Sequence, residues 1–268
     1  MSEITILLLY LLAALGFAAS RLPRFDAYSN PALIAAFAFA VGGLLVHGQF
    51  LNAEIITSSG LILSIESTLS LVGLQLALIG LLGATEPILR GMTAGLLGLA
   101  ALATLPLGLQ PPIDVSTELT WQIQAHILTS IFAYGLLAAG AIVAIYALIQ
   151  DRRLRTGHLS SVNQLFAPLE TTERLLFGVA TAGFVGLLLS IVSGFTFVED
   201  LFAQHLVHKT ALSILAVVLF GIVVGGRIFA GWRGRLAVYL YLGGFAVLCL
   251  AYFGARFVLE NILGRTWT

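Results

Sequence analysis

Long apolar stretches recur from one end of this 268-residue chain to the other, with no extended polar block between them. A helix needs about 20 apolar residues to cross a hydrocarbon core that is about 30 Å thick. The sequence therefore predicts an all-α integral membrane protein, an eight-transmembrane-helix bundle that forms a single membrane domain over residues 1–268. The predicted helices lie at about residues 3–20, 31–49, 60–84, 89–108, 122–150, 174–195, 205–229 and 235–263.

Composition excludes several classes of protein. Hydrophobic residues make up 59% of the chain and charged residues 10%, whereas soluble domains carry about 25% charge. The formal net charge is zero and no basic block is present, which argues against a nucleic-acid-binding protein. The single cysteine, Cys249, excludes an internal disulfide, a CxxC redox pair and a CxxCH haem-attachment motif. We expect it to be a buried small apolar residue.

Basic residues predict the orientation of the chain, because cytoplasmic loops carry the excess of Lys and Arg. Ten fall on one side of the predicted membrane: Arg21, Arg24, Arg90, Arg152, Arg153, Arg155, Arg174, Arg227, Arg233 and Arg235. Three fall on the other: Lys209, Arg256 and Arg265. Both termini are therefore predicted outside.

The first apolar segment has no basic residue before it, so we expect a retained helix rather than a cleaved signal peptide. The inner connection from Asp151 to Glu173 is either an amphipathic stretch on the membrane surface or a solvated loop.

The histidines are the residues whose presence is least accounted for by a lipid environment. His47, His126, His205 and His208 lie near predicted outer helix ends, and His158 lies in the inner connection. A histidine there is often an interface anchor or a hydrogen-bonding partner between helices. His205 and His208 are three residues apart and share one helix face, which is also compatible with a binding site. Imidazole binds haem iron as well as zinc, but no HxxxH or HExxH motif is present.

Other polar residues in apolar segments leave alternatives open. Glu66 and Gln75 would be penalised by lipid unless they face the bundle or the interface. Arg256 and Glu260 form an i,i+4 pair, or Arg256 pairs with a haem propionate or another anion. No GxSxG elbow, P-loop or Rossmann-type GxGxxG motif is present, and no nucleophile has an evident base. We therefore do not expect an enzyme.

Several stretches resemble the cytochrome c assembly protein family. They are WQIQAHILTSIFAYGLLAAGAIVAIYAL (121–148), LFAPLETTERLLF (165–177), GFVGLLLSIVSG (183–194), LVHKTALSILAVVLFGIVVGGRIFAGWRGRLA (206–237) and LAYFGARFVLE (250–260). Within the family they are most similar to the branch of YpjD-type inner membrane proteins. The resemblance runs from about residue 120 to the end, while the first four predicted helices match only in layout. It implies an eight-helix fold in a bacterial inner membrane, shared with proteins that handle haem at its outer face.

The resemblance also implies a candidate cofactor and its ligands. His126 occupies the position of an outer haem-ligand histidine, and the pair His208-Lys209 stands where this branch has a His-Lys pair. The implied site binds b-type, non-covalent haem through iron ligands His126 and His208, with His205 as a competing ligand and Arg256 near a propionate. The family's tryptophan-rich outer segment is missing, because the only tryptophans are Trp121, Trp232 and Trp267. A role in presenting haem for attachment to cytochrome is therefore not implied.

Three functions remain open at the level of sequence. The first is a haem-binding membrane protein. The second is an accessory or regulatory subunit of an inner membrane cation exporter of the magnesium type, without haem chemistry. The third is a small-molecule or ion transporter that uses Glu66, Gln75 and the acidic residues on the outer side as a pathway. Besides the lipid bilayer, the possible partners are such an exporter or a cytochrome assembly component.

Overall fold

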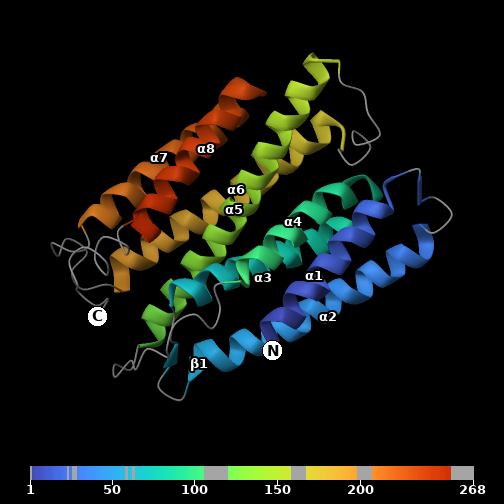
Figure 1. Ribbon diagram of the computed structural model, residues 1–268. Coiled ribbons are helices and arrows are strands. Elements are labelled where there is room, and N and C mark those ends of the chain that lie inside the picture. Colours follow the sequence, from blue (N-terminus) through green and yellow to red (C-terminus); the bar gives the residue numbers. More distant parts are fainter. Residues whose placement is uncertain are drawn as a thin grey trace. The chain divides into compact units, whose positions relative to one another are not determined.

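The computed structural model describes residues 2–22, 24–25, 29–57, 60–61, 64–105, 120–157, 167–197 and 207–254. Helices dominate these residues (Figure 1). The α-helices are α1 (Ser2–Ala19), α2 (Ser29–Ile55), α3 (Ile65–Ala84), α4 (Arg90–Ala103), α5 (Trp121–Arg155), α6 (Leu169–Phe197), α7 (Val207–Ala230) and α8 (Arg235–Cys249). The short elements are strands β1 (Ile56–Thr57) and β2 (Gly60–Leu61), the 3-10 turn η2 (Pro87–Leu89) and the π-helical segment η4 (Leu250–Gly254).

Each α-helix overlaps one predicted membrane span, but two expectations about the connection between α2 and α3 are wrong. The second helix was expected to end at residue 49 and continues to Ile55. The third was expected from residue 60 and begins at Ile65, because the Ser64 hydroxyl accepts a hydrogen bond from the Ser67 backbone N–H and starts the helix there. The antiparallel pair β1–β2 occupies part of the intervening segment.

Seven helices of the described part of the chain are long and apolar enough to cross a membrane. The exception is α4, which has 14 residues and belongs to the shorter apolar segment Pro87–Ala103. The chain is thus a helical, multi-pass membrane protein, whereas eight crossings and two outer termini stay predictions.

Tertiary contacts divide the chain into two compact units, residues 1–120 with 146–174 and residues 121–145 with 175–268. The first contains α1 to α4, and the second contains α7 and α8 with most of α5 and α6. The prediction of a single membrane domain stays a prediction.

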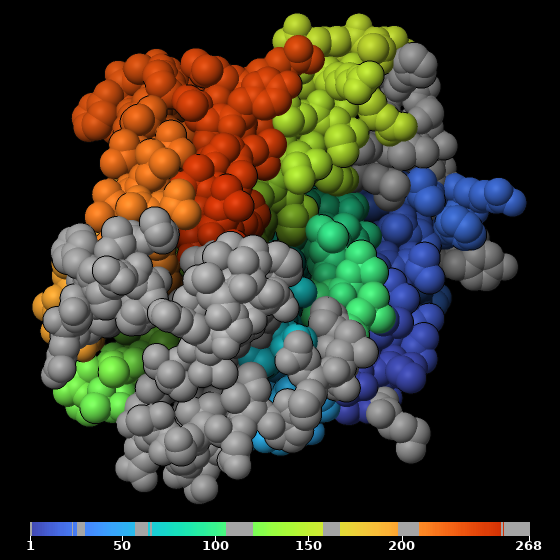
Figure 2. Space-filling view, turned by 60° about the vertical axis from the view of Figure 1, so that its left-hand side comes forward, coloured from blue at the N-terminus to red at the C-terminus, as the bar shows by residue number. Residues whose placement is uncertain are grey.

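Small residues bring the helices of the first unit together. A β-carbon placed on Gly16 of α1 would lie 2.8 Å from the Ala36 β-carbon of α2, and one on Gly73 of α3 would lie 2.8 Å from that of Ala103. Thr93 of α4 donates a hydrogen bond to the Gly80 carbonyl at 2.9 Å. Such close approaches are how helices associate in lipid, where the hydrophobic effect does not drive them together. Figure 2 shows α4 (green) beside α1 (blue).

Within the second unit, α5 and α8 meet through Tyr241. Its hydroxyl donates a hydrogen bond to the Leu137 carbonyl at 2.9 Å, and its ring packs edge-on against Phe220 of α7, with 5.1 Å between ring centroids. Gly140 leaves room for the hydroxyl, since a β-carbon there would collide with it. Tyr241 is completely buried, so this contact joins three helices in the core of the unit.

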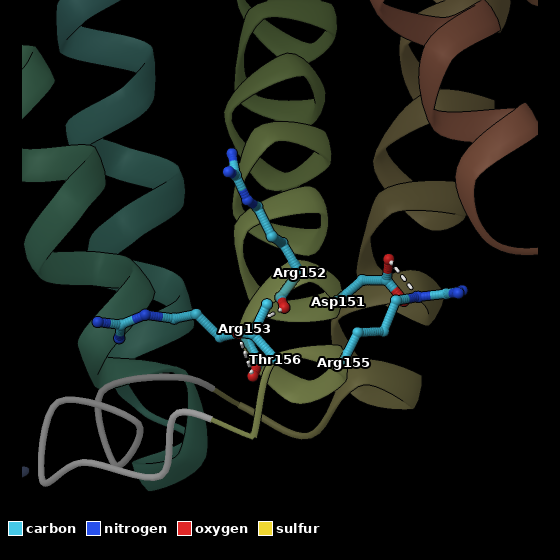
Figure 3. Close-up of polar contacts among 5 residues, drawn as sticks. All are labelled: Asp151, Arg152, Arg153, Arg155 and Thr156. Atoms are coloured by element: carbon cyan, nitrogen blue, oxygen red, sulfur yellow. Dashed lines mark hydrogen bonds and ion pairs between the residues drawn. The ribbon is translucent and has the colours of Figure 1, made fainter.

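Basic side chains gather at the end of α5 (Figure 3). Arg155 folds back onto Asp151, with 3.1 Å between Nε and Oδ1, while Arg152 and Arg153 extend in other directions. The three guanidinium groups therefore spread out and do not converge on one anion site. This spread suits a helix end that lies among lipid headgroups.

Candidate functional site

His126 lies near the start of α5, which begins at Trp121. Its ring is half-buried, and its Nδ1 lies 2.9 Å from the Ser193 hydroxyl on α6. The next residue of α6, Gly194, lets the helix approach the ring closely, because a β-carbon there would lie only 3.1 Å from Cε1 of His126. The imidazole is thus held against α6 by one of its two nitrogens.

The hydrogen bonds around Ser193 favour one tautomer of the His126 ring. A hydroxyl has one proton to donate, and Ser193 donates it to the Ser190 carbonyl at 2.8 Å. The Ser193 oxygen therefore accepts from Nδ1–H, which makes Nε2 the unprotonated nitrogen of the neutral ring. An unprotonated imidazole nitrogen of this kind can bind a metal ion.

Two further serines reinforce this part of the contact between α5 and α6. The Ser130 hydroxyl donates to the His126 carbonyl at 2.7 Å, and its oxygen lies 2.6 Å from the Ser190 hydroxyl. Ser190 is 6% exposed. The backbone of His126 and its ring are therefore both tied to one face of α6. Hydrogen-bonding residues that surround a metal-ligating histidine commonly orient its ring in this way.

The sequence predicted His126 as a ligand, which stays a prediction, and did not point to Ser130, Ser190 or Ser193. A signal was present, because Ser130 follows His126 by four residues and Ser190 precedes Ser193 by three, so each pair shares a helix face. Serines are common in membrane helices, however, and spacing within one helix does not reveal which face of another helix it meets.

The structure does not describe the side chains of the other predicted ligands. His208 lies in the first turn of α7, and its side chain is outside the described residues. His205 and Arg256 lie entirely outside them. Of the predicted set, only His126 has a described side chain.

His47 differs from the expectation of a histidine near a helix end, because α2 continues past it to Ile55. Its Nδ1 lies 3.1 Å from the Tyr10 hydroxyl of α1, and its Nε2 lies 2.7 Å from the Ser70 hydroxyl of α3. All three residues have 0% exposure. We call this group the Tyr10–His47–Ser70 brace. Both ring nitrogens are occupied, so His47 ties three helices together and has no lone pair left for a metal.

Glu66 also has a local structural explanation. It lies in the first turn of α3, two residues after the Ser64 cap, where a carboxylate interacts favourably with the helix dipole. Among the described residues, no group of three His, Cys, Asp or Glu side chains could hold a metal ion.

Comparisons with known proteins agree with the resemblance described above. The family model for cytochrome c assembly protein matches residues 4–263. Inner membrane protein YpjD of Escherichia coli K12 is 32% identical over 228 residues, which cover 83% of this chain and 86% of that protein. An uncharacterized 28.8 kDa protein in the nifR3-like 5' region of Azospirillum brasilense is 29% identical over 171 residues, 63% of each chain. No solved structure matches significantly. The match includes the first four helices, which sequence reasoning had aligned only by layout. The chain therefore belongs to the cytochrome c assembly protein family.

Proposed function

We propose that this chain binds haem b non-covalently and that Nε2 of His126 is an axial ligand of the iron. The observation that carries the proposal is the hydrogen bond between His126 Nδ1 and the Ser193 hydroxyl, which favours the tautomer with an unprotonated Nε2. A ligating histidine characteristically donates its other N–H to a fixed acceptor, and that bond sets both tautomer and ring orientation. Membership of the cytochrome c assembly protein family supports haem as the ligand.

The second axial ligand is proposed from the family resemblance alone. His208 is the first candidate, with His205 as its competitor, and Arg256 is a candidate partner for a propionate. When bound, haem would supply an iron that accepts nitrogen ligands, and the residues of this chain would supply a ligand and an apolar environment. We propose haem holding or handling rather than catalysis. The name of the Escherichia coli relative supports placement in a bacterial inner membrane.

The absorption spectrum of protein purified in detergent from haem-replete cells tests this function. We expect a Soret band in the parent protein and its loss or a marked shift in His126→Ala. Added imidazole should restore the parent spectrum in His126→Ala, because a free ring can replace a lost ligand but cannot repair a misfolded bundle. His158→Ala is the control, since the sequence places His158 in the inner connection.

Separate outcomes identify which part of the proposal is wrong. If His126→Ala keeps the parent spectrum, the axial ligand is another residue. If the parent protein binds no haem, either from cells or by titration with haemin, the haem function is wrong. The accessory-subunit interpretation then becomes the favoured one, and crosslinking in membranes would be the way to find a partner protein.

A further inference from the structure

Lys209 is the only lysine in the chain and lies in the first turn of α7. Its side chain is half-buried, with Nζ 5.7 Å from the centre of the Tyr252 ring. An ammonium over an aromatic face is attracted by the negative face of the ring. Lys209 is therefore drawn over this ring, whereas an interfacial lysine would ordinarily extend toward the headgroups.

Tyr252 is itself held in place. It belongs to η4, the π-helical segment that continues α8, and its ring packs edge-on against Tyr134 of α5 at 5.7 Å between centroids. Tyr134 in turn donates a hydrogen bond to the Leu248 carbonyl at 3.0 Å. Segments with π-helical geometry often occur at functional sites. Here the π-helical segment carries the ring over which Lys209 lies.

Tyr252 also connects Lys209 to α5, because its ring packs against Tyr134, which follows His126 by eight residues on that helix. The same region of the second unit thus presents two complementary groups, an unprotonated imidazole nitrogen on α5 and an oriented cation on α7. A ligand that satisfies both carries a metal ion and an anionic group. Haem does so, because its iron takes a nitrogen ligand and its propionates carry negative charge.

We propose that Lys209, positioned by Tyr252, pairs with a propionate of the haem bound at His126. This inference rests on the proposed haem function and adds a specificity-determining residue to it. It assigns to Lys209 the propionate contact for which sequence reasoning had offered only Arg256. The porphyrin already supplies nitrogen ligands to the iron, so the protein needs to add only a few contacts. One histidine would then fix the position of the macrocycle, and one cation would fix its rotation.

The test compares haem with its dimethyl ester, in which both propionates are esterified and uncharged. Each is titrated into detergent-purified apoprotein of the parent, Lys209→Met, Lys209→Arg and Arg256→Met. We expect Lys209→Met to weaken haem binding about 10-fold, as loss of a charge-assisted contact does, and to leave binding of the diester unchanged. Lys209→Arg keeps the charge and should restore most of the affinity. Arg233→Met, at the α7–α8 turn, is the matched control.

Amine-selective labelling provides a second readout, because Lys209 is the only side-chain amine in the chain. Haem should slow acylation of Lys209 in the parent protein, while the diester should not. The inference is overturned if Lys209→Met weakens haem and diester binding equally, or weakens neither. Failure of the parent protein to bind either compound would instead refute the proposed function, and this inference with it.

Discussion

Ser193 connects the chemistry of His126 to the packing of α5 against α6. Its hydroxyl accepts from His126 Nδ1–H and donates to the Ser190 carbonyl, so a single oxygen sets the tautomer and anchors the ring. Thr196 lies on the same helix, and its hydroxyl donates only to helix carbonyls, those of Val192 and Ser193. The two residues form a matched pair for substitution.

Ser193→Ala should weaken haem binding about 10-fold, the lower end of the range for losing a partner that orients a ligating histidine. The ring loses its acceptor and populates other orientations and the other tautomer. Haemin titration followed in the Soret region measures the effect. Thr196→Ala should bind like the parent protein. Equal affinity of Ser193→Ala and Thr196→Ala would show that the hydroxyl does not orient a ligand.

The Tyr10–His47–Ser70 brace makes a separate prediction about stability. Tyr10→Phe removes one hydroxyl and leaves the His47 nitrogen without a partner in a fully buried site. Hydrogen bonds between membrane helices contribute about 0.6 kcal/mol on average and up to about 1.7 kcal/mol. We expect the upper part of that range for the loss in free energy of unfolding, measured by SDS titration. Tyr239→Phe, at an exposed tyrosine, should cost much less. A cost no larger than that of the control would contradict the brace.

At the scale of single elements, the length of apolar runs predicted the existence of each α-helix in the described residues but not all of the helix ends. Helix α3 starts at a capping serine and not where its apolar run begins. The sequence predicted less well which helices contact each other, because contacts such as that of Tyr241 with Leu137 depend on which helix faces meet. His126 was proposed as a ligand from its position in the family. Its acceptor Ser193 lies on another helix and could not be predicted in that way. Periodicity within one helix carries no information about the register of another.

The contact between α5 and α8 yields a prediction at this scale. Gly140→Ala places a β-carbon against the Tyr241 hydroxyl, so the helices must move apart or the tyrosine must leave the Leu137 carbonyl. Overpacking of this kind costs about 1–3 kcal/mol in unfolding free energy. Gly243→Ala, where a β-carbon meets no atom within 4 Å, should be neutral or stabilising.

Adding Tyr241→Phe to Gly140→Ala isolates the cause. The double variant removes the colliding hydroxyl, so it should be less destabilised than the sum of the two single variants, as measured by SDS unfolding. Additive costs would mean that Gly140 is required for a reason other than room for this hydroxyl.

For the whole molecule, the decisive question is whether α4 crosses the membrane. Its close contacts run in opposite order to those of α3, with Gly80 beside Thr93 and Leu96, and Gly73 beside Ala103. The two helices therefore form an antiparallel hairpin, and α4 leads the chain back along α3. With 14 residues at 1.5 Å each, α4 spans about 21 Å, which is shorter than the hydrocarbon core but within reach of a thinned or locally adapted bilayer.

The distribution of charge favours a crossing. If α4 crosses, α4 and α5 together return the chain to the side on which it left α3, so Arg90 and the arginines at the end of α5 share the cytoplasmic side. If α4 does not cross, those arginines lie opposite Arg90, and the termini lie on opposite sides. Reporter fusions after Arg155 and Arg233 should therefore read as cytoplasmic, and fusions after Leu105 and Thr268 as external. A cytoplasmic reading at Leu105 together with an external reading at Arg155 would show that α4 does not cross, would leave seven crossings, and would place His126 at the cytoplasmic end of α5.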